Sequence, residues 1–233
     1  MYFKYGSEEI EFLKSRDDLL GAAIERIGHI YRVVDNNLFS SVIHHIIGQQ
    51  ISTRAQATIW QRLNDRVEGI QPDTICSIET EELQKLGMTF RKTDYIKEFA
   101  QKVKSKEIDL DALINRSDSM VVKELSALKG IGVWTAEMIM IFCLQRPDVL
   151  SYGDLAIHRG MRMLYHHRNI DKKKFEKYAK RYSPYGTVAS LYLWAIAGGA
   201  IGEMRDYAPK KKGAAKNDTR RNVESGIRKR CSL

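Results

Sequence analysis

Apolar side chains recur at every third or fourth position along most of the chain, which is the period of a helix with one buried face. No run of alternating apolar and polar residues bounded by turn residues indicates a pair of strands. The pattern therefore predicts an all-α fold with about a dozen helices. Besides a short helix opened by Pro72, the expected helices cover residues 8–16, 17–28, 36–51, 53–67, 80–87, 91–105, 109–116, 118–128, 133–144, 154–167, 171–182 and 185–199.

The segment ALKGIGVWTAE (127–137) interrupts this helical pattern with two glycines. Each glycine inside a helix costs about 1 kcal/mol relative to alanine, so Gly130 and Gly132 predict a tight hairpin between two helices. The first amides of the second helix have no partners within the helix, and together with the helix dipole they can bind a phosphate. The Thr135 hydroxyl is a further donor. Such a contact anchors a DNA backbone without reading its sequence.

The longer string LSALKGIGVWTAEMIM (125–140) resembles the signature of the helix–hairpin–helix DNA glycosylase superfamily. In that family an essential aspartate follows the hairpin by about twenty residues, and VLSYGDLAIHRGM supplies Asp154, which follows Trp134 at that spacing. IIGQQIS (46–52) is similar to the family's helix end that faces the lesion, and SPYGTVASLYLWAI (183–196) to its closing helix.

The resemblance covers roughly residues 36–200 and implies the architecture as well as the chemistry. It implies a glycosylase domain over residues 1–208, with two helical lobes, the hairpin, and the catalytic aspartate at the cleft between the lobes. The second lobe is expected to be built from both ends of the chain. Residues 209–233 are expected to form a basic, disordered tail.

Asp154 carries the predicted chemistry. Glycosylases flip a damaged nucleotide out of the duplex and break its N-glycosidic bond through a transition state with positive charge on the sugar. A buried carboxylate stabilises that charge and orients or deprotonates water. The alternative is that Asp154 is only the N-cap of the helix that follows it, a common role for this residue type.

The position of Trp134 separates the branches of the family. Bifunctional members carry a lysine two residues after the second hairpin glycine, and its amine attacks the sugar. Because Trp134 stands there, we expect a monofunctional enzyme without abasic-site lyase activity. Trp134 resembles the 3-methyladenine DNA glycosylase II branch, and purines alkylated at N3 or N7 carry a positive charge that aromatic faces attract. Three cysteines cannot hold a four-cysteine iron–sulfur cluster.

The resemblance also assigns the remaining site residues. Gln50 occupies the position of a side chain inserted into the vacated base stack, where an apolar wedge is common. For Trp194 and Met138, the alternative to a role in the base pocket is packing in the core. For Lys129, the alternative to a phosphate contact is a solvated side chain. The expected base pocket is formed by Trp134, Trp194, Gln49 and Met138, and the expected backbone contacts by Lys129, Gly130, Ile131, Gly132, Val133 and Thr135.

No cofactor is expected to be required, although the family often binds a monovalent cation through hairpin carbonyls. By position, a Na⁺ or K⁺ ion would take the carbonyl oxygens of Ser126, Leu128 and Ile131. Arg91 and Lys92, expected in a loop after Gly87, are further phosphate candidates. Five of the six histidines have no metal-like spacing with acids or thiols and are interpreted as structural or surface residues, namely His44, His45, His158, His166 and His167.

The net charge of +9 is concentrated near the C-terminus. Residues 209–233 hold nine Lys and Arg but only two acidic residues, so the other 208 residues carry a net charge of only +2. This tail is either a solvated disordered end or an auxiliary arm that binds phosphate. With no signal peptide and no apolar run of about 20 residues, we expect a cytoplasmic protein that binds no membrane. The family resemblance implies a monomer that binds double-stranded DNA with alkylated bases.

Two other functions stay open from the sequence. One is a glycosylase for oxidised or deaminated bases, which would differ in the pocket and not in the fold. The other is a non-catalytic helix–hairpin–helix DNA-binding module, which would not need Asp154. A metal-dependent nuclease is disfavoured because Asp148, Asp154 and Asp171 are not spaced as a paired-metal site.

Overall fold

The computed structural model describes residues 1–209, and the expected all-α fold is confirmed there. In this part of the chain the only extended pairing is one isolated antiparallel bridge between Tyr2 and Val33. The predicted tail, residues 209–233, lies outside the described residues except for Pro209. The thirteen helices are α1 (Ser7–Arg16), α2 (Asp18–Ile27), α3 (Leu38–Gly48), α4 (Thr53–Arg66), α5 (Pro72–Ser77), α6 (Thr80–Lys85), α7 (Phe90–Lys104), α8 (Leu110–Ile114), α9 (Asp118–Ser126), α10 (Val133–Phe142), α11 (Leu155–Tyr165), α12 (Lys172–Tyr182) and α13 (Gly186–Ala197).

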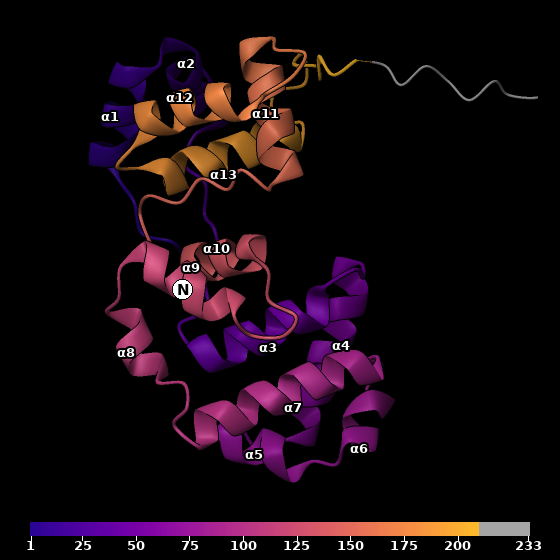
Figure 1. The fold of residues 1–233 in the computed structure, drawn as a ribbon. Helices are drawn as coiled ribbons and strands as arrows, with labels where there is room; N and C mark the ends of the chain where they lie inside the picture. The colour runs from indigo at the N-terminus through magenta and orange to yellow at the C-terminus, as the bar shows by residue number, and fades with distance from the viewer. Residues whose placement is uncertain (210–233) are drawn as a thin grey trace, which may run out of the picture.

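The helices form two lobes, each with its own apolar core (Figure 1). One core is built from α3 to α10, in the middle of the chain. The other combines α1 and α2 with α11, α12 and α13, so the two ends of the described chain share one lobe. Trp194 on α13 packs against both cores, which places it at the boundary between the lobes.

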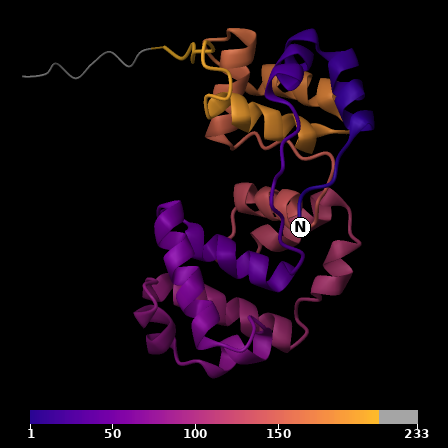
Figure 2. The ribbon, with the colours of Figure 1, turned by 180° about the vertical axis from the view of Figure 1, so that it is seen from behind.

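Extended segments connect the lobes. Figure 2 shows the N-terminal residues and the segment after α2 running side by side between them. Backbone hydrogen bonds join the two segments, from Phe3 N to Arg32 O at 2.8 Å and from Val34 N to Met1 O at 3.1 Å. Asp35 N then donates to Phe142 O at 2.8 Å, which fixes the second segment to the end of α10.

Helix α7 begins at Phe90, one residue before the helix expected over 91–105. Thr89 is its N-cap and accepts a hydrogen bond from Lys92 N at 3.3 Å, so Arg91 and Lys92 lie in the first helical turn. The expectation that both residues belong to a loop is therefore wrong. Thr89 is a favourable cap residue, and its hydroxyl satisfies one of the amides left free at the helix start.

Helices α11 and α13 approach each other closely at Gly160. A Cβ atom added there would lie 2.2 Å from the carbonyl oxygen of Leu193, which real Cβ atoms do not approach so closely. Glycine therefore permits this backbone contact. Because Asp154 directly precedes α11 and Trp194 lies on α13, this close packing also fixes the two elements that carry these residues.

The hairpin between α9 and α10 turns at Gly130, whose φ of +83° favours glycine. A Cβ atom on Gly130 would lie 2.3 Å from the ring of Tyr95 on α7. The space beside the Gly130 Cα is therefore occupied by the Tyr95 side chain. At Gly132, by contrast, an added Cβ atom meets nothing within 4 Å, so this side of the hairpin is open.

Candidate active site

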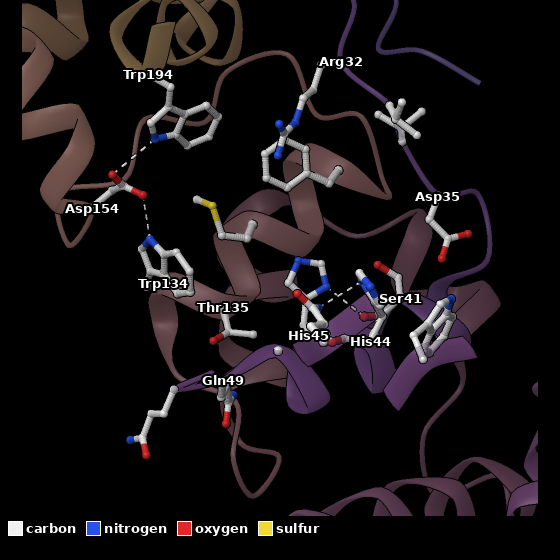
Figure 3. A pocket seen from close by; sticks show the side chains of 18 residues that line it. Arg32, Asp35, Ser41, His44, His45, Gln49, Trp134, Thr135, Asp154 and Trp194 are labelled. Carbon is white, nitrogen blue, oxygen red and sulfur yellow. Dashed lines mark hydrogen bonds between the residues drawn. The ribbon is translucent and has the colours of Figure 1, made fainter. Parts of the chain in front are cut away.

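A cavity of about 710 Å³ lies where the two lobes meet (Figure 3). It is lined by residues from α3, α4, α10 and α13, by the segment that links α2 to α3, and by the residue that precedes α11. One part of its wall is formed by Asp154 with aromatic and apolar side chains. Another part is polar and carries Arg32, Asp35, His44 and His45.

Asp154 is buried, with 6% of its surface exposed, and four N–H groups donate to its carboxylate. Two are backbone amides of α11, from Ala156 at 2.8 Å and Ile157 at 2.9 Å, and both reach Oδ1. The other two are indole groups (Figure 3): Trp134 Nε1 donates to Oδ2 at 2.8 Å and Trp194 Nε1 to Oδ1 at 3.2 Å.

These contacts combine the two roles that the sequence left open for Asp154. Oδ1 caps α11, as expected of an aspartate before a helix. Oδ2 faces Trp134 at the cavity, and within residues 1–209 no Lys, Arg or His forms an ion pair with the carboxylate. The carboxylate group is therefore oriented by neutral donors, and its negative charge is available to a positive charge in the cavity.

The two tryptophans reach the carboxylate from opposite lobes. Trp134 lies in the first turn of α10 and is 46% exposed, so its ring is accessible to a ligand. Trp194 is partly buried, and its ring lies 5.6 Å from that of Phe142. Trp194 therefore combines the two roles considered from the sequence, since its side chain packs on both cores and also lines the cavity.

Met138 and Thr135 follow Trp134 on α10 and line the same cavity. Met138 is 3% exposed and belongs to the core, so its apolar side chain closes the wall from behind. Thr135 is 6% exposed. Its side chain lies at the cavity, and the predicted hydrogen bond from its hydroxyl to a backbone phosphate stays a prediction.

A second carboxylate lies beside the loop that carries Asp154. The hydroxyl of the buried Ser151 donates to Glu137 on α10, and Asp154 N donates to Ser151 O at 3.3 Å. Burial raises the pKa of Glu137, and the nearby charge of Asp154 raises it further against the opposing effect of the Ser151 bond. Glu137 thus connects the second hairpin helix to the loop that carries Asp154, a contact that the sequence did not indicate.

Gln49 and Gln50 follow the end of α3 at the cavity wall. Gln49 Nε2 donates to the carbonyl of Gly130 at 2.5 Å, so this side chain holds the hairpin in place. Lys92 Nζ donates to the carbonyls of Ile47 at 2.8 Å and Gln49 at 2.6 Å, and burial lowers its pKa. Lys92 therefore satisfies the end of α3, a role other than the phosphate contact considered from the sequence.

Gln50 is exposed and has a φ of +57°, in the left-handed region that residues other than glycine rarely adopt. Such conformations cost of order 1 kcal/mol and persist where the surroundings impose them, often at functional sites. Gln50 also lines the cavity. Its conformation and exposure are compatible with the predicted wedge, which stays a prediction.

The outer face of the hairpin carries the predicted backbone contacts. Val133 is 54% exposed and Gly132 is open, so the free amides at the start of α10 are accessible there. Lys129 is exposed and forms an ion pair with Glu98 at 2.8 Å. Arg91 Nε donates to the hydroxyl of Tyr95 at 2.6 Å. Phosphate binding by these groups stays a prediction.

The ligands predicted for the hairpin cation are chemically suitable, because backbone carbonyl oxygens are typical ligands of hard cations. Leu128 O also accepts a hydrogen bond from Ile131 N at 3.1 Å, which leaves it one free lone pair. The carbonyls of Ser126 and Ile131 stay predicted ligands. Over the described part of the chain, no group of three or more His, Cys, Asp or Glu side chains is arranged to hold a metal ion.

The polar part of the cavity could not be predicted from the sequence. His44 and His45, interpreted there as structural or surface residues, both line the cavity on α3. The Arg32 guanidinium lies over the Phe142 ring at 4.5 Å, and Asp35 accepts from Ser40 Oγ at 2.9 Å. The histidines come directly before the IIGQQIS segment, and this proximity was the available signal.

Fold and cavity together define a helix–hairpin–helix protein with a buried aspartate between two tryptophans at an interlobe cleft. The profile described as "HhH-GPD superfamily base excision DNA repair protein" matches residues 43–184. The chain belongs to this superfamily. Because the profile covers both the hairpin and Asp154, the family resemblance seen in the sequence is confirmed.

Individual relatives agree with this assignment. The chain is 31% identical over 182 residues to DNA-3-methyladenine glycosylase 1 of Schizosaccharomyces pombe, covering 74% of this chain and 78% of that one. The crystal structure of a DNA-3-methyladenine glycosidase from Bacillus halodurans superposes with a TM-score of 0.79, at 37% identity over 89% of this chain and 97% of that one.

A DNA complex is also among the similar structures. The 3-methyladenine DNA glycosylase Mag1 of Schizosaccharomyces pombe, bound to abasic DNA, superposes with a TM-score of 0.72 at 25% identity, covering 81% of this chain and 96% of that one. None of the helices within residues 1–209 of the present chain has the length and apolarity needed to cross a membrane.

Proposed function

We propose that this protein is a monofunctional DNA glycosylase that removes alkylated purines, of the 3-methyladenine and 7-methylguanine type, from double-stranded DNA. The observation that carries the proposal is the Asp154 carboxylate, held at the cavity by the indole N–H groups of Trp134 and Trp194. The names of the relatives, which are 3-methyladenine glycosylases, support the substrate class.

In this mechanism the flipped nucleotide enters the cavity with its sugar beside Asp154 and its base against the aromatic wall. A purine alkylated at N3 or N7 is cationic, so it is attracted to the indole face and is a good leaving group. As the glycosidic bond breaks, positive charge develops on the sugar and the Asp154 carboxylate stabilises it. Water then adds to the sugar, with Asp154 orienting it or accepting its proton.

The absence of strand cleavage is part of the same proposal. Lysine amines form the covalent sugar intermediate in lyases, and none of the described residues that line this cavity is a lysine. The amine of Lys92 is committed elsewhere, because it donates hydrogen bonds to the carbonyls of Ile47 and Gln49 at the end of α3. The hairpin cation, the monomeric state and the cytoplasmic location stay predictions from the sequence.

The experiment is base release from methylated duplex DNA, with strand nicking scored before and after alkali. We expect free methylpurines and abasic sites that stay uncut until alkali is added. Trapping with borohydride should give no covalent protein–DNA adduct. Release of oxidised or deaminated bases alone would favour the other glycosylase class. DNA binding without release of any base would favour the non-catalytic module.

A further inference from the structure

The side chain of His45 has a defined protonation pattern. It lies on α3 and is half-buried, and its Nδ1 is 2.8 Å from the carbonyl oxygen of Ser41, one turn earlier. A carbonyl oxygen only accepts hydrogen bonds, so Nδ1 carries the hydrogen. In a neutral ring, Nε2 is then an acceptor with a free lone pair.

The surroundings of His45 favour that neutral ring. Burial lowers its pKa, against the weaker opposing effects of the Ser41 bond and the charge of Asp35. His44, the adjacent imidazole, also has a pKa lowered by burial. Arg32 lines the same cavity and adds a positive charge. Within residues 1–209, no group donates a hydrogen bond to His45 Nε2.

His45 and Asp154 line one cavity but come from different elements. Figure 3 shows Asp154 between the two tryptophans and His45 with His44 and Ser41 in another part of the wall. In the proposed mechanism the sugar lies at Asp154. The edge of the base that faces away from the sugar therefore extends from Asp154 into the cavity. Glycosylases read this Watson–Crick edge of a flipped base by hydrogen bonds.

Alkylated purines differ in what this edge presents. 3-Methyladenine carries its 6-amino group there, and 7-methylguanine carries N1–H and its 2-amino group. 1,N6-Ethenoadenine has no N–H on this edge, because the etheno bridge occupies N1 and N6. A single neutral acceptor in an otherwise aromatic pocket would distinguish these two groups of bases.

We propose that His45 Nε2 accepts a hydrogen bond from an N–H on the Watson–Crick edge of the flipped base. His45 thereby selects alkylated purines that carry such a donor over those that lack one. The inference rests on the proposed function and adds a specificity-determining residue to it.

His44 provides a matched control on the same helix. Its Nδ1 lies 3.4 Å from the side-chain amide of Gln56, and its ring packs edge-on against Trp60 at 4.7 Å. Its hydrogen-bonding and packing partners are thus within the protein. Replacing His44 removes an imidazole of the same type without removing the acceptor assigned to the base.

The experiment compares kcat/KM for release of 3-methyladenine and of 1,N6-ethenoadenine, measured for wild type, His45→Leu, His45→Gln and His44→Leu. The two bases differ as leaving groups, but that difference is common to all four proteins and cancels when their ratios are compared. We expect His45→Leu to lower the preference for 3-methyladenine about tenfold, the effect of one hydrogen bond. His45→Gln keeps an acceptor and should retain the preference, and so should His44→Leu.

Tight binding of each variant to duplex DNA with an abasic site shows that it is folded. If His45→Leu does not fold, His45→Phe removes the acceptor while keeping a flat ring. An unchanged ratio in a folded His45→Leu or His45→Phe variant overturns the inference and leaves the proposed function intact. Failure of the wild type to release any alkylpurine overturns the proposed function, and the inference with it.

Discussion

Trp134→Phe removes one hydrogen bond to the Asp154 carboxylate and keeps an aromatic ring at the cavity. Trp134 Nε1 is the donor to Asp154 Oδ2 at 2.8 Å, whereas Oδ1 accepts from Ala156, Ile157 and Trp194. After the substitution, Oδ2 has no donor among residues 1–209. The carboxylate then loses part of its orientation toward the sugar.

The magnitude follows from the charge and exposure of the pair. A hydrogen bond to a charged group contributes about 1.5–3 kcal/mol, and the 46% exposure of Trp134 places this one near the lower limit, because water replaces part of it. A loss of about 1.4 kcal/mol corresponds to a tenfold slower reaction. The assay is single-turnover release of 3-methyladenine from duplex DNA.

Trp194→Phe is the matched comparison, because its bond is longer at 3.2 Å and Oδ1 keeps two backbone donors without it. We expect a smaller loss of rate than for Trp134→Phe. A Trp134→Phe rate equal to that of wild type, with base release still dependent on Asp154, would refute the orienting role of the indole N–H. A larger loss in Trp194→Phe would refute the assigned order.

Three further changes test the surroundings of the site. Glu137→Gln keeps an acceptor for Ser151 and removes a carboxylate whose folded pKa is raised. Wild-type stability falls as pH rises from the unfolded pKa of Glu137 through its folded pKa. Thermal melting should therefore show the variant to be more stable than wild type at pH 7, with the difference lost on acidification. An equal difference in melting temperature at neutral and acidic pH would contradict this. Gln50→Gly relieves the left-handed backbone and should stabilise the fold by about 1 kcal/mol in denaturant titrations while slowing excision; a less stable variant would exclude strain at this position. Gly160→Ala forces a Cβ atom against Leu193 O and should destabilise the protein by about 1–3 kcal/mol, lowering Tm and excision together. Melting at the wild-type temperature would show that α11 and α13 can separate freely.

Local sequence was sufficient for much of the fold. The helical period, the two glycines of the hairpin and an aspartate before an apolar helix are all short-range signals, and α9, α10 and α11 form where they predict. The assignment of Arg91 and Lys92 to a loop was wrong, since the cap at Thr89 was not recognised in the sequence. In each case the deciding interaction lies within a few residues.

The composition of the cavity could be predicted only in part. Asp154 and Trp134 are separated by a family-typical spacing, and the structure brings their side chains together. No local signal shows that Lys92 binds the end of α3 or that His45 lines the cavity. These contacts depend on how α3, α7 and the two lobes pack, so the tertiary structure had to supply them.

Asp154→Asn tests the central claim most directly. Asparagine also caps helices well, so α11 should stay intact, but an amide replaces the charge beside the sugar. Single-turnover release of 3-methyladenine should fall by at least about 10²-fold, more than in Trp134→Phe, while affinity for abasic-site DNA is retained. Release at a rate near that of wild type, with abasic-site binding intact, would contradict the assignment of Asp154 as the catalytic carboxylate.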